Sequence, residues 1–257
     1  MQTINAVPEA LRRFFGEHPK LALAFSGGTD SAYLLYAAKA CGCDVRAFCV
    51  RSAFQPAFER RDALRLAELL GAPLTFVPVD VLSIEDVRKN PANRCYYCKR
   101  TIFAALADAA RAQGYPAVMD GTNASDDAAD RPGMRALIEL DVLSPLRLCG
   151  VTKDDVRRYS REAGLFTWDK PAYACLATRI AAGTPIDADT LRRVEGAEAA
   201  LLEMGFSDFR VRVFHGAARL QLPSGQMATA VERREEIRDV IGTYFDTVLL
   251  DLKDRMS

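Results

Sequence analysis

The segment Ser-Gly-Gly-Thr-Asp-Ser, residues 26–31, has the residue types that bind a phosphate together with a divalent cation. Gly27 and Gly28 carry no Cβ that could obstruct a phosphate, and the helix-forming segment that follows offers unpaired N–H groups and a positive dipole end. The Asp30 carboxylate can hold Mg²⁺, and the Ser31 hydroxyl can reach a phosphate. The loop lacks the lysine of a Walker A motif and the spacing of a dinucleotide-binding fingerprint. Ser-Gly-Gly alone is equally typical of a turn that binds nothing, but Asp30 and Ser31 favour an anion site.

A second polar segment, Asp-Gly-Thr-Asn-Ala-Ser-Asp-Asp at residues 120–127, follows a short apolar run. Asp and Asn side chains at the end of a strand can orient a nucleotide or hold Mg²⁺, and Gly121 lets the backbone approach a ligand. By itself this composition is more typical of a polar surface loop. Combined with residues 26–31, it favours a nucleotide site to which Asp120, Gly121 and Thr122 contribute.

Three cysteines could take part in chemistry. Cys95 and Cys98 have C-x-x-C spacing at the predicted start of a helix, and Cys175 lies farther along in a Pro-containing loop. The pair alone can share a metal, form a redox couple or merely lie close together, and the helix N-terminus would stabilise a thiolate in each case. Three thiolates without an evident fourth ligand fit a [4Fe–4S] cluster that keeps one iron open, whereas structural zinc takes a closed set of four.

Two arginines form the last candidate pair. Arg210 and Arg212 are two residues apart in an alternating segment, so on a strand both project from the same face. Paired guanidinium groups suit a phosphate or a carboxylate. A solvated strand edge is the alternative, which this pattern alone leaves open.

The elements predicted around these residues alternate between strands and helices, which implies right-handed βαβ units and a parallel sheet with helices on both faces. Ligands of such sheets bind outside the carboxyl ends of the strands, where Ser26 and Asp120 both fall. The predicted strands are the run from Leu21, Asp44–Arg51, Leu74–Val79 and Ala117–Asp120, and the predicted helices are Val7–Phe15, Ala32–Ala40, Ala57–Leu70, Asn93–Gln113 and Val151–Gly164, the last with Thr152 as its cap.

The pattern changes beyond Arg179. A helix, two alternating strands around His215-Gly216, a second helix and a last strand suit a small α+β domain. These segments are, in order, Thr190–Met204, Phe209–Phe214, Ala218–Leu222, Thr229–Tyr244 and Thr247–Leu252. We therefore predict an α/β domain at residues 1–179 and a smaller α+β domain at residues 180–257.

The composition is that of an ordinary globular protein. The 257 residues are 49% hydrophobic and 26% charged, and 34 Lys and Arg balance 34 Asp and Glu. Because the net charge is zero, we expect no overall electrostatic attraction to nucleic acid or to an anionic membrane. We recognise no targeting segment and no apolar run of about 18 residues. We expect a cytoplasmic protein without a membrane or nucleic-acid partner. Seven cysteines are too few for a disulfide scaffold, and four of them are predicted to be packing residues, namely Cys41, Cys43, Cys49 and Cys149.

Several segments, taken in order, resemble the LarE family of PP-loop sulfur transferases. They are Ser26–Ser31, Arg94–Lys99, Asp120–Asn123, Arg131–Gly133, Ser144–Leu146, Cys175–Arg179 and Arg210–Arg212. PP-loop ATP pyrophosphatases split ATP between the α and β phosphates and leave an adenylated substrate. The resemblance implies that residues 1–179 form such a domain with ATP and Mg²⁺, and that Arg210 and Arg212 bind the phosphate of a substrate nucleotide in the smaller domain.

The resemblance also implies a reaction. ATP would adenylate the carboxylates of pyridinium-3,5-biscarboxylic acid mononucleotide, and sulfur would replace AMP to give thiocarboxylates for the nickel-pincer nucleotide cofactor of lactate racemase. Cys175 matches the sulfur-bearing position, and in single-cysteine members that thiol gives up its own sulfur and becomes dehydroalanine. This chain also has Cys95 and Cys98, so we expect a [4Fe–4S] cluster on the three thiolates whose open iron carries a sulfide for transfer. Sulfide or a sulfur-donor protein would resupply it, and we expect a homo-oligomer.

Three alternatives remain at this stage. A tRNA-thiolating PP-loop enzyme can also pair this loop with C-x-x-C and a distant third cysteine, although the zero net charge argues against tRNA. An amide-forming relative such as an NAD or GMP synthetase would leave the three cysteines without a task. A nucleotide-binding regulatory module with structural zinc and no turnover is the third alternative.

Overall fold

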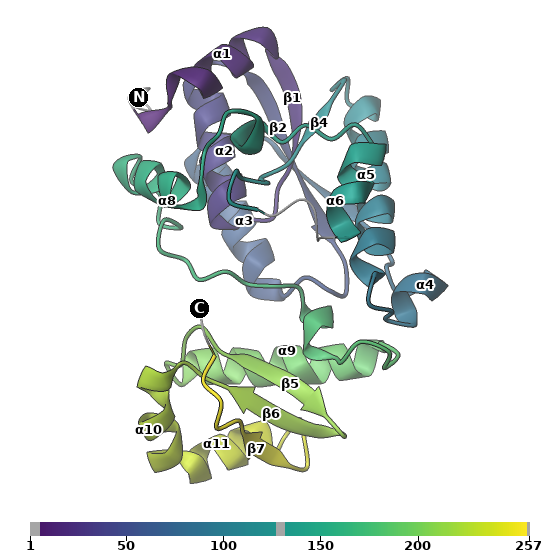
Figure 1. Cartoon of the computed structure of the whole chain (residues 1–257), viewed down its shortest axis with the longest axis vertical. Helices are drawn as coiled ribbons and strands as arrows, with labels where there is room; N and C mark the ends of the chain where they lie inside the picture. The colour runs from purple at the N-terminus through teal and green to yellow at the C-terminus, as the bar shows by residue number, and fades with distance from the viewer. Residues whose placement is uncertain (1–5, 127–131, 256–257) are drawn as a thin grey trace. The chain divides into compact units, whose positions relative to one another are not determined.

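The computed structural model describes residues 6–126 and 132–255 and divides the chain into two compact units. The first unit comprises residues 1–81 and 93–170, and the second comprises residues 82–92 and 171–257 (Figure 1). The sequence pattern places the change of architecture at residue 180, whereas in the structure residues 82–92 and 171–179 also pack with the smaller unit.

The first unit is built on a four-stranded parallel sheet, as predicted. The strand order is β3-β2-β1-β4, with the chain running outward from β1 to β3 and then crossing to β4 on the other side. The order reverses between β1 and β4, and crevices for ligands form at such switch points. The strands are β1 (Lys20–Ala24), β2 (Asp44–Arg51), β3 (Leu74–Pro78) and β4 (Val118–Met119).

Helices cover both faces of this sheet because its strands alternate apolar side chains between two cores. Leu21 and Leu23 of β1 point into one core, while Ala22 between them points into the other. The first core takes in α1 (Glu9–Glu17), α2 (Thr29–Ala40), α3 (Ala57–Leu69), α7 (Pro145–Leu148) and α8 (Lys153–Glu162). The second takes in α5 (Arg94–Ala112) and α6 (Pro132–Glu139). The prediction of a doubly covered α/β sheet is confirmed.

Local signals explain where two of these helices begin. The Thr152 side chain accepts the Asp155 N–H, and the Asp155 carboxylate accepts the Thr152 N–H, which is a capping box at the start of α8. The predicted cap at Thr152 is therefore confirmed. Gly28 precedes α2 in an extended conformation, so the first N–H groups of that helix face the loop of residues 26–31.

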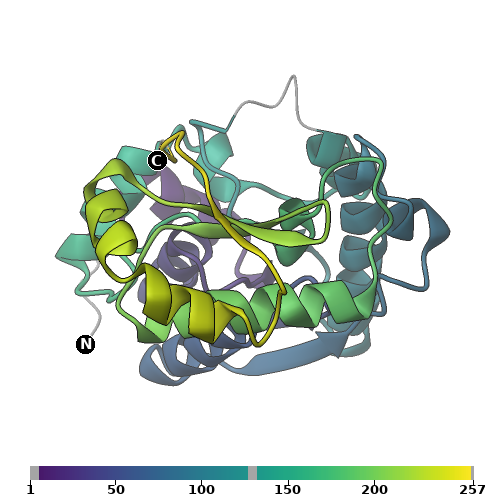
Figure 2. The same ribbon diagram turned by 90° about the horizontal axis from the view of Figure 1, so that it is seen from below.

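The second unit contains a three-stranded sheet of order β5-β6-β7. Strands β5 (Arg210–Phe214) and β6 (Ala217–Gln221) form a hairpin whose turn residues, His215 and Gly216, both have positive φ, and β7 (Val248–Leu250) runs parallel to β6. Its helical elements are α4 (Glu85–Arg88), the 3₁₀ turn η2 (Leu176–Arg179), α9 (Ala188–Glu203), α10 (Ser224–Glu232) and α11 (Arg234–Ile241). Figure 2 shows α9 lying along this sheet. The predicted α+β pattern is confirmed.

One predicted helix is wrong. The segment 229–244 was expected to be continuous, but it breaks at Arg233 into α10 and α11. The Arg233 guanidinium donates to the Met204 carbonyl at 2.8 Å, and its centre lies 5.6 Å from the Phe206 ring. These contacts fix the chain at a point where propensity alone favours a helix, so tertiary packing decides the break. Over residues 6–126 and 132–255, no helix is long and apolar enough to cross a membrane.

Candidate active site

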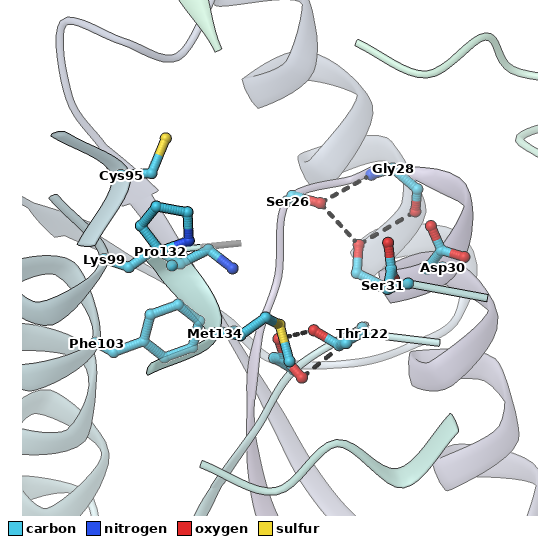
Figure 3. Close-up of a pocket in the computed structure, with 15 residues that line it drawn as sticks. Ser26, Gly28, Asp30, Ser31, Cys95, Lys99, Phe103, Thr122, Pro132 and Met134 are labelled. Carbon is cyan, nitrogen blue, oxygen red and sulfur yellow. Dashed lines mark hydrogen bonds between the residues drawn. The ribbon is translucent and has the colours of Figure 1, made fainter. Parts of the chain in front are cut away.

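The loop between β1 and α2 is closed by its own serine hydroxyls. Ser26 Oγ accepts the Gly28 N–H at 3.3 Å and lies 3.1 Å from Ser31 Oγ, while the Ser31 hydroxyl donates to the Gly28 carbonyl at 3.1 Å (Figure 3). The loop therefore keeps its shape without a ligand, and both hydroxyls lie beside the N-terminus of α2. This geometry suits an anion, as the residue types predict.

Two glycines allow the backbone packing that builds this region. Gly27 has φ +75°, and a Cβ there would lie 3.0 Å from the Ala63 nitrogen of α3. A Cβ on Gly121 would lie 3.0 Å from the Ser31 nitrogen. The absence of a Cβ at Gly121 therefore lets the loop after β4 pack closely against the start of α2, and the predicted approach of a ligand stays a prediction.

A pocket of about 510 Å³ lies at the carboxyl end of this sheet, within the first unit. It brings together both predicted polar loops, which are separated in the sequence but follow neighbouring strands. Figure 3 shows Cys95 and Lys99 of α5 across the pocket from Ser26 and Ser31. The lining residues are Ala24, Ser26, Gly28, Asp30, Ser31, Cys95, Lys99, Phe103, Asp120, Gly121, Thr122, Asp126, Pro132, Gly133 and Met134. Asp127 and Arg131 fall outside the described residues.

Asp30 is held by two side-chain donors from other segments. Its carboxylate accepts an N–H from Asn123 at 3.2 Å and from the Lys153 ammonium at 2.5 Å. The sequence reasoning missed Lys153. The available signal was its position directly after the predicted Thr152 cap, which puts it in the first turn of a helix that starts near the sheet edge. The site therefore contains a fixed cation next to the predicted Mg²⁺ ligand.

Asp120 lines the pocket, and its carboxylate is also hydrogen-bonded within its own loop. Its Oδ1 accepts the Thr122 N–H at 3.2 Å and the Ser144 hydroxyl at 2.7 Å, and its Oδ2 accepts the Thr122 hydroxyl at 2.5 Å. The residue is 6% exposed. The carboxylate thus organises the loop after β4 and joins it to the start of α7, while Thr122 and Gly121 present the loop surface to the pocket.

A second cation reaches the pocket from α5. The Lys99 side chain passes over Gly133, where a Cβ would lie 2.8 Å from Lys99 Cδ. Its amino group points into the pocket in Figure 3. Lys99 and Lys153 together give the site two ammonium groups, which can offset the charge of a triphosphate.

Cys175 lies in the second unit, directly before η2, and is half-buried. The same unit holds a buried ion pair in which Arg179 Nε donates to Glu198 Oε1 at 2.8 Å. Burial opposes the charge of Arg179, but the hydrogen bonds and charge of Glu198 prevail and raise its pKa. Arg210 and Arg212 lie on β5, and burial, together with the charge of Arg179, lowers the pKa of both, to about 10 for Arg210.

The predicted cysteine ligands lie in different units. Cys95 and Cys98 occupy the first turns of α5 in the first unit, and Cys175 belongs to the second. Among the residues that the structure describes, no three His, Cys, Asp or Glu side chains gather into a metal site. The three-thiolate cluster stays a prediction.

The four cysteines assigned to packing are packed. Cys43 and Cys49 are 6% and 0% exposed, and Cys41 and Cys149 lie against the same core. Burial raises the pKa of all four thiols, to about 11 for Cys43. Their predicted role is confirmed.

Comparison with known proteins identifies relatives along nearly the whole chain. The chain is 36% identical over 254 residues to an uncharacterised protein of Synechocystis sp., covering 97% of this chain and 94% of that protein. It is 33% identical to the pyridinium-3,5-bisthiocarboxylic acid mononucleotide synthase of Lactiplantibacillus plantarum, over 91% of this chain and 86% of the synthase. No family model matches the chain.

More distant relatives share part of the chain. The tRNA-specific 2-thiouridylase of Thermotoga petrophila is 26% identical over 57% of this chain and 52% of the thiouridylase. This likeness agrees with a PP-loop fold built on a parallel sheet. The synthase matches across both units and at higher identity, and the pocket joins the loop of residues 26–31 to that of residues 120–126. The chain therefore belongs to the LarE family of ATP-dependent PP-loop sulfurtransferases.

Proposed function

We propose that this protein adenylates the carboxylates of pyridinium-3,5-biscarboxylic acid mononucleotide with ATP and replaces AMP with sulfur, giving thiocarboxylates for a nickel-pincer cofactor. One observation carries the proposal: the pocket of the first unit joins the anion-binding loop to Cys95 of the C-x-x-C segment. A site for ATP cleavage and a sulfur-bearing residue thus face the same space. The Lactiplantibacillus relative is a synthase of pyridinium-3,5-bisthiocarboxylic acid mononucleotide, which is the product of this reaction.

Activation of the carboxylate comes first because oxide is a poor leaving group. A carboxylate oxygen attacks the α-phosphorus of ATP, the bond to the bridging oxygen of the β-phosphate breaks, and pyrophosphate leaves. The N–H groups at the start of α2 and the hydroxyls of Ser26 and Ser31 hold the departing pyrophosphate. Lys99 and Lys153 lie where they offset its charge.

Mg²⁺ fits this site through Asp30. The carboxylate borders the pocket; its Oδ1 accepts from the neutral Asn123 amide and its Oδ2 from the Lys153 ammonium, so Mg²⁺ would take the place of these donors. Bound Mg²⁺ would supply a counter-charge for the phosphates of ATP. Asp120 lines the same pocket, but its oxygens accept three hydrogen bonds that hold its own loop to the start of α7, and a metal there would have to break them.

The sulfur source is proposed from the three thiols. Cys95 and Cys98 are spaced so that they lie on the same side of α5, and Arg94 Nη2 donates to Cys95 Sγ at 3.8 Å. Cys95 is exposed and Cys98 is partly exposed, and such a thiol pair with a cationic donor suits an anionic iron–sulfur group. A [4Fe–4S] cluster held by these residues and Cys175 would supply the sulfur for transfer. In the absence of a cluster, Cys175 would give up its own sulfur.

The test is an anaerobic assay with ATP and pyridinium-3,5-biscarboxylic acid mononucleotide. We expect pyrophosphate release that depends on the dicarboxylate, and a product whose mass shows oxygen replaced by sulfur. Asp30→Asn should abolish both, and tRNA in place of the dicarboxylate should give neither. Pyrophosphate release that depends on tRNA, or no release with either substrate, would reject the proposal.

The same sample distinguishes the two sulfur sources. Mössbauer spectroscopy of protein reconstituted with iron and sulfide should show a [4Fe–4S] cluster, and the Cys175 peptide should keep its mass after turnover. Loss of the mass of H₂S from that peptide, without a cluster signal, would establish the sacrificial route instead.

A further inference from the structure

The loop that carries Cys175 has no regular secondary structure between residues 171 and 175, and the short η2 turn follows it. The Cys175 carbonyl accepts the Thr178 N–H of η2, whereas the carbonyls before it belong to no helix or sheet. A partly buried carbonyl without a donor is costly, so such loops must find their hydrogen bonds elsewhere. Here three arginine side chains of the same unit provide them.

The arginine donors bracket Cys175. Arg210 Nη2 donates to the Ala172 carbonyl at 2.6 Å, and Arg212 Nη1 donates to the Thr178 carbonyl at 2.6 Å. These two carbonyls lie equally far along the chain before and after Cys175. Between them, Arg179 Nη1 donates to the carbonyls of Ala174 at 2.8 Å and of Cys175 itself at 3.4 Å. The backbone is therefore held on both sides of the thiol.

Arg210 and Arg212 are themselves fixed, which makes the bracing rigid. Arg210 is 6% exposed, donates a second N–H to the Phe209 carbonyl at 2.6 Å, and lies with its centre 5.0 Å from the Tyr173 ring. Arg212 Nε donates to Gln221 on the neighbouring strand β6 at 2.5 Å. A guanidinium has a planar set of donors, so it can serve a loop carbonyl and a second acceptor at once.

We propose that Arg210 and Arg212 are positioning residues that fix the backbone on either side of Cys175 and so hold its sulfur in one orientation for transfer. The role of Cys175 in sulfur transfer rests on the proposed function, whereas the arginine hydrogen bonds to the carbonyls around it do not. A role limited to binding substrate phosphate would act only when a nucleotide is present. Bracing acts in the nucleotide-free protein, where the two roles can be separated.

The experiment is hydrogen–deuterium exchange of the peptide covering residues 171–180, with iodoacetamide labelling of Cys175, in reduced, metal-free and nucleotide-free protein. Arg212→Gln is the first variant because Arg212 is only partly buried. The amides of Thr178 and Ile180, which donate to the carbonyls of Cys175 and Ala177, should exchange about tenfold faster or more. Cys175 labelling should accelerate similarly, and Arg212→Lys should recover part of the protection.

Arg193→Gln is the matched control. Arg193 also donates to a carbonyl, that of Tyr244 at 2.6 Å, and its centre lies 4.5 Å from the Phe245 ring, but it does not contact the Cys175 loop. In the Arg193→Gln variant, hydrogen exchange of residues 171–180 should equal that of the wild type. Wild-type exchange and labelling in Arg212→Gln, with only a raised KM for the nucleotide substrate, would overturn the proposal. Failure of sulfur transfer in the wild type would reject the proposed function and leave this result unchanged.

Discussion

Replacing Glu198 with Gln tests the buried charge network behind the Cys175 loop. Glu198 is 2% exposed and Arg179 is 1% exposed. Arg179 donates to both carboxylate oxygens, at 2.8 and 3.0 Å, the Val211 N–H donates to Oε1 at 2.9 Å, and the Tyr173 hydroxyl donates to Oε2. Four donors thus converge on one carboxylate, and Arg179 depends on it for its counter-charge.

The expected cost follows from what Gln can accept. Its single oxygen can serve one side of the former carboxylate, while its amide N–H groups face the donors of Arg179 and Tyr173 on the other. Removing one partner of a buried ion pair costs about 3–5 kcal/mol, because the remaining charge is left without compensation. The free energy of unfolding falls by about 1–3 kcal/mol per molar urea. The urea concentration at the unfolding midpoint should therefore fall by on the order of 2 M.

The assay is a urea titration followed by circular dichroism, with pulsed hydrogen exchange assigning the shift to the second unit. The control is Glu236→Gln, which breaks an ion pair of 2.8 Å with Arg233 in the same unit at a side chain that is 53% exposed. Such a pair contributes at most about 1 kcal/mol. Equal, small shifts for Glu198→Gln and Glu236→Gln would refute the reasoning from burial.

Three further predictions concern the first unit. Lys153→Met removes the ammonium 2.5 Å from Asp30 and should lower dicarboxylate-dependent pyrophosphate release by roughly 100-fold, whereas Lys89→Met, at an exposed ion pair, should leave the rate unchanged. Gly121→Ala puts a Cβ 3.0 Å from a backbone nitrogen and should weaken ATP binding by about tenfold in calorimetry; unchanged affinity would contradict the close packing. Burial raises the pKa of Cys43 from 9.0 to about 11, so the native state keeps this proton longer than the unfolded chain. The Cys43 contribution to stability should therefore fall between pH 9 and 11, by up to about 3 kcal/mol, in urea titrations, and Cys43→Ala should make the slope shallower but leave the part due to Cys41, Cys49 and Cys149.

The sheet and the position of the site could be predicted because their signals are local. An apolar run followed by Gly27 and Gly28 marks a strand and its exit loop, and the alternation of such runs with helices dictates a parallel sheet. Once the strands are parallel, Ser26 and Asp120 must emerge at the same edge. Their meeting in one pocket required no knowledge of side-chain contacts.

Contacts between distant segments could not be predicted in this way. The Thr152 cap places Lys153 in the first turn of α8, but its ion pair with Asp30 depends on how that helix docks, which the sequence pattern does not specify. Residues 82–92 pack with the smaller unit through Asn90, a buried residue with φ 55° whose side chain donates to the carbonyls of Ala181 at 2.8 Å and Thr184 at 3.0 Å. An Asn in a polar stretch gives no sign of such partners, so the segment could not be assigned to that unit.

Some residues of the two motifs form hydrogen bonds that hold the protein's own backbone, whether or not they also take part in the reaction. Asp120 uses both of its oxygens to build the loop that carries Thr122, and Arg210 uses its donors on two carbonyls. Loss of activity on replacing either residue would therefore not identify a ligand contact. Asp30 differs, because its carboxylate is held by ammonium and amide donors beside an open pocket. Replacing Asp30 therefore tests the proposed Mg²⁺ ligand more directly than replacing Asp120 does.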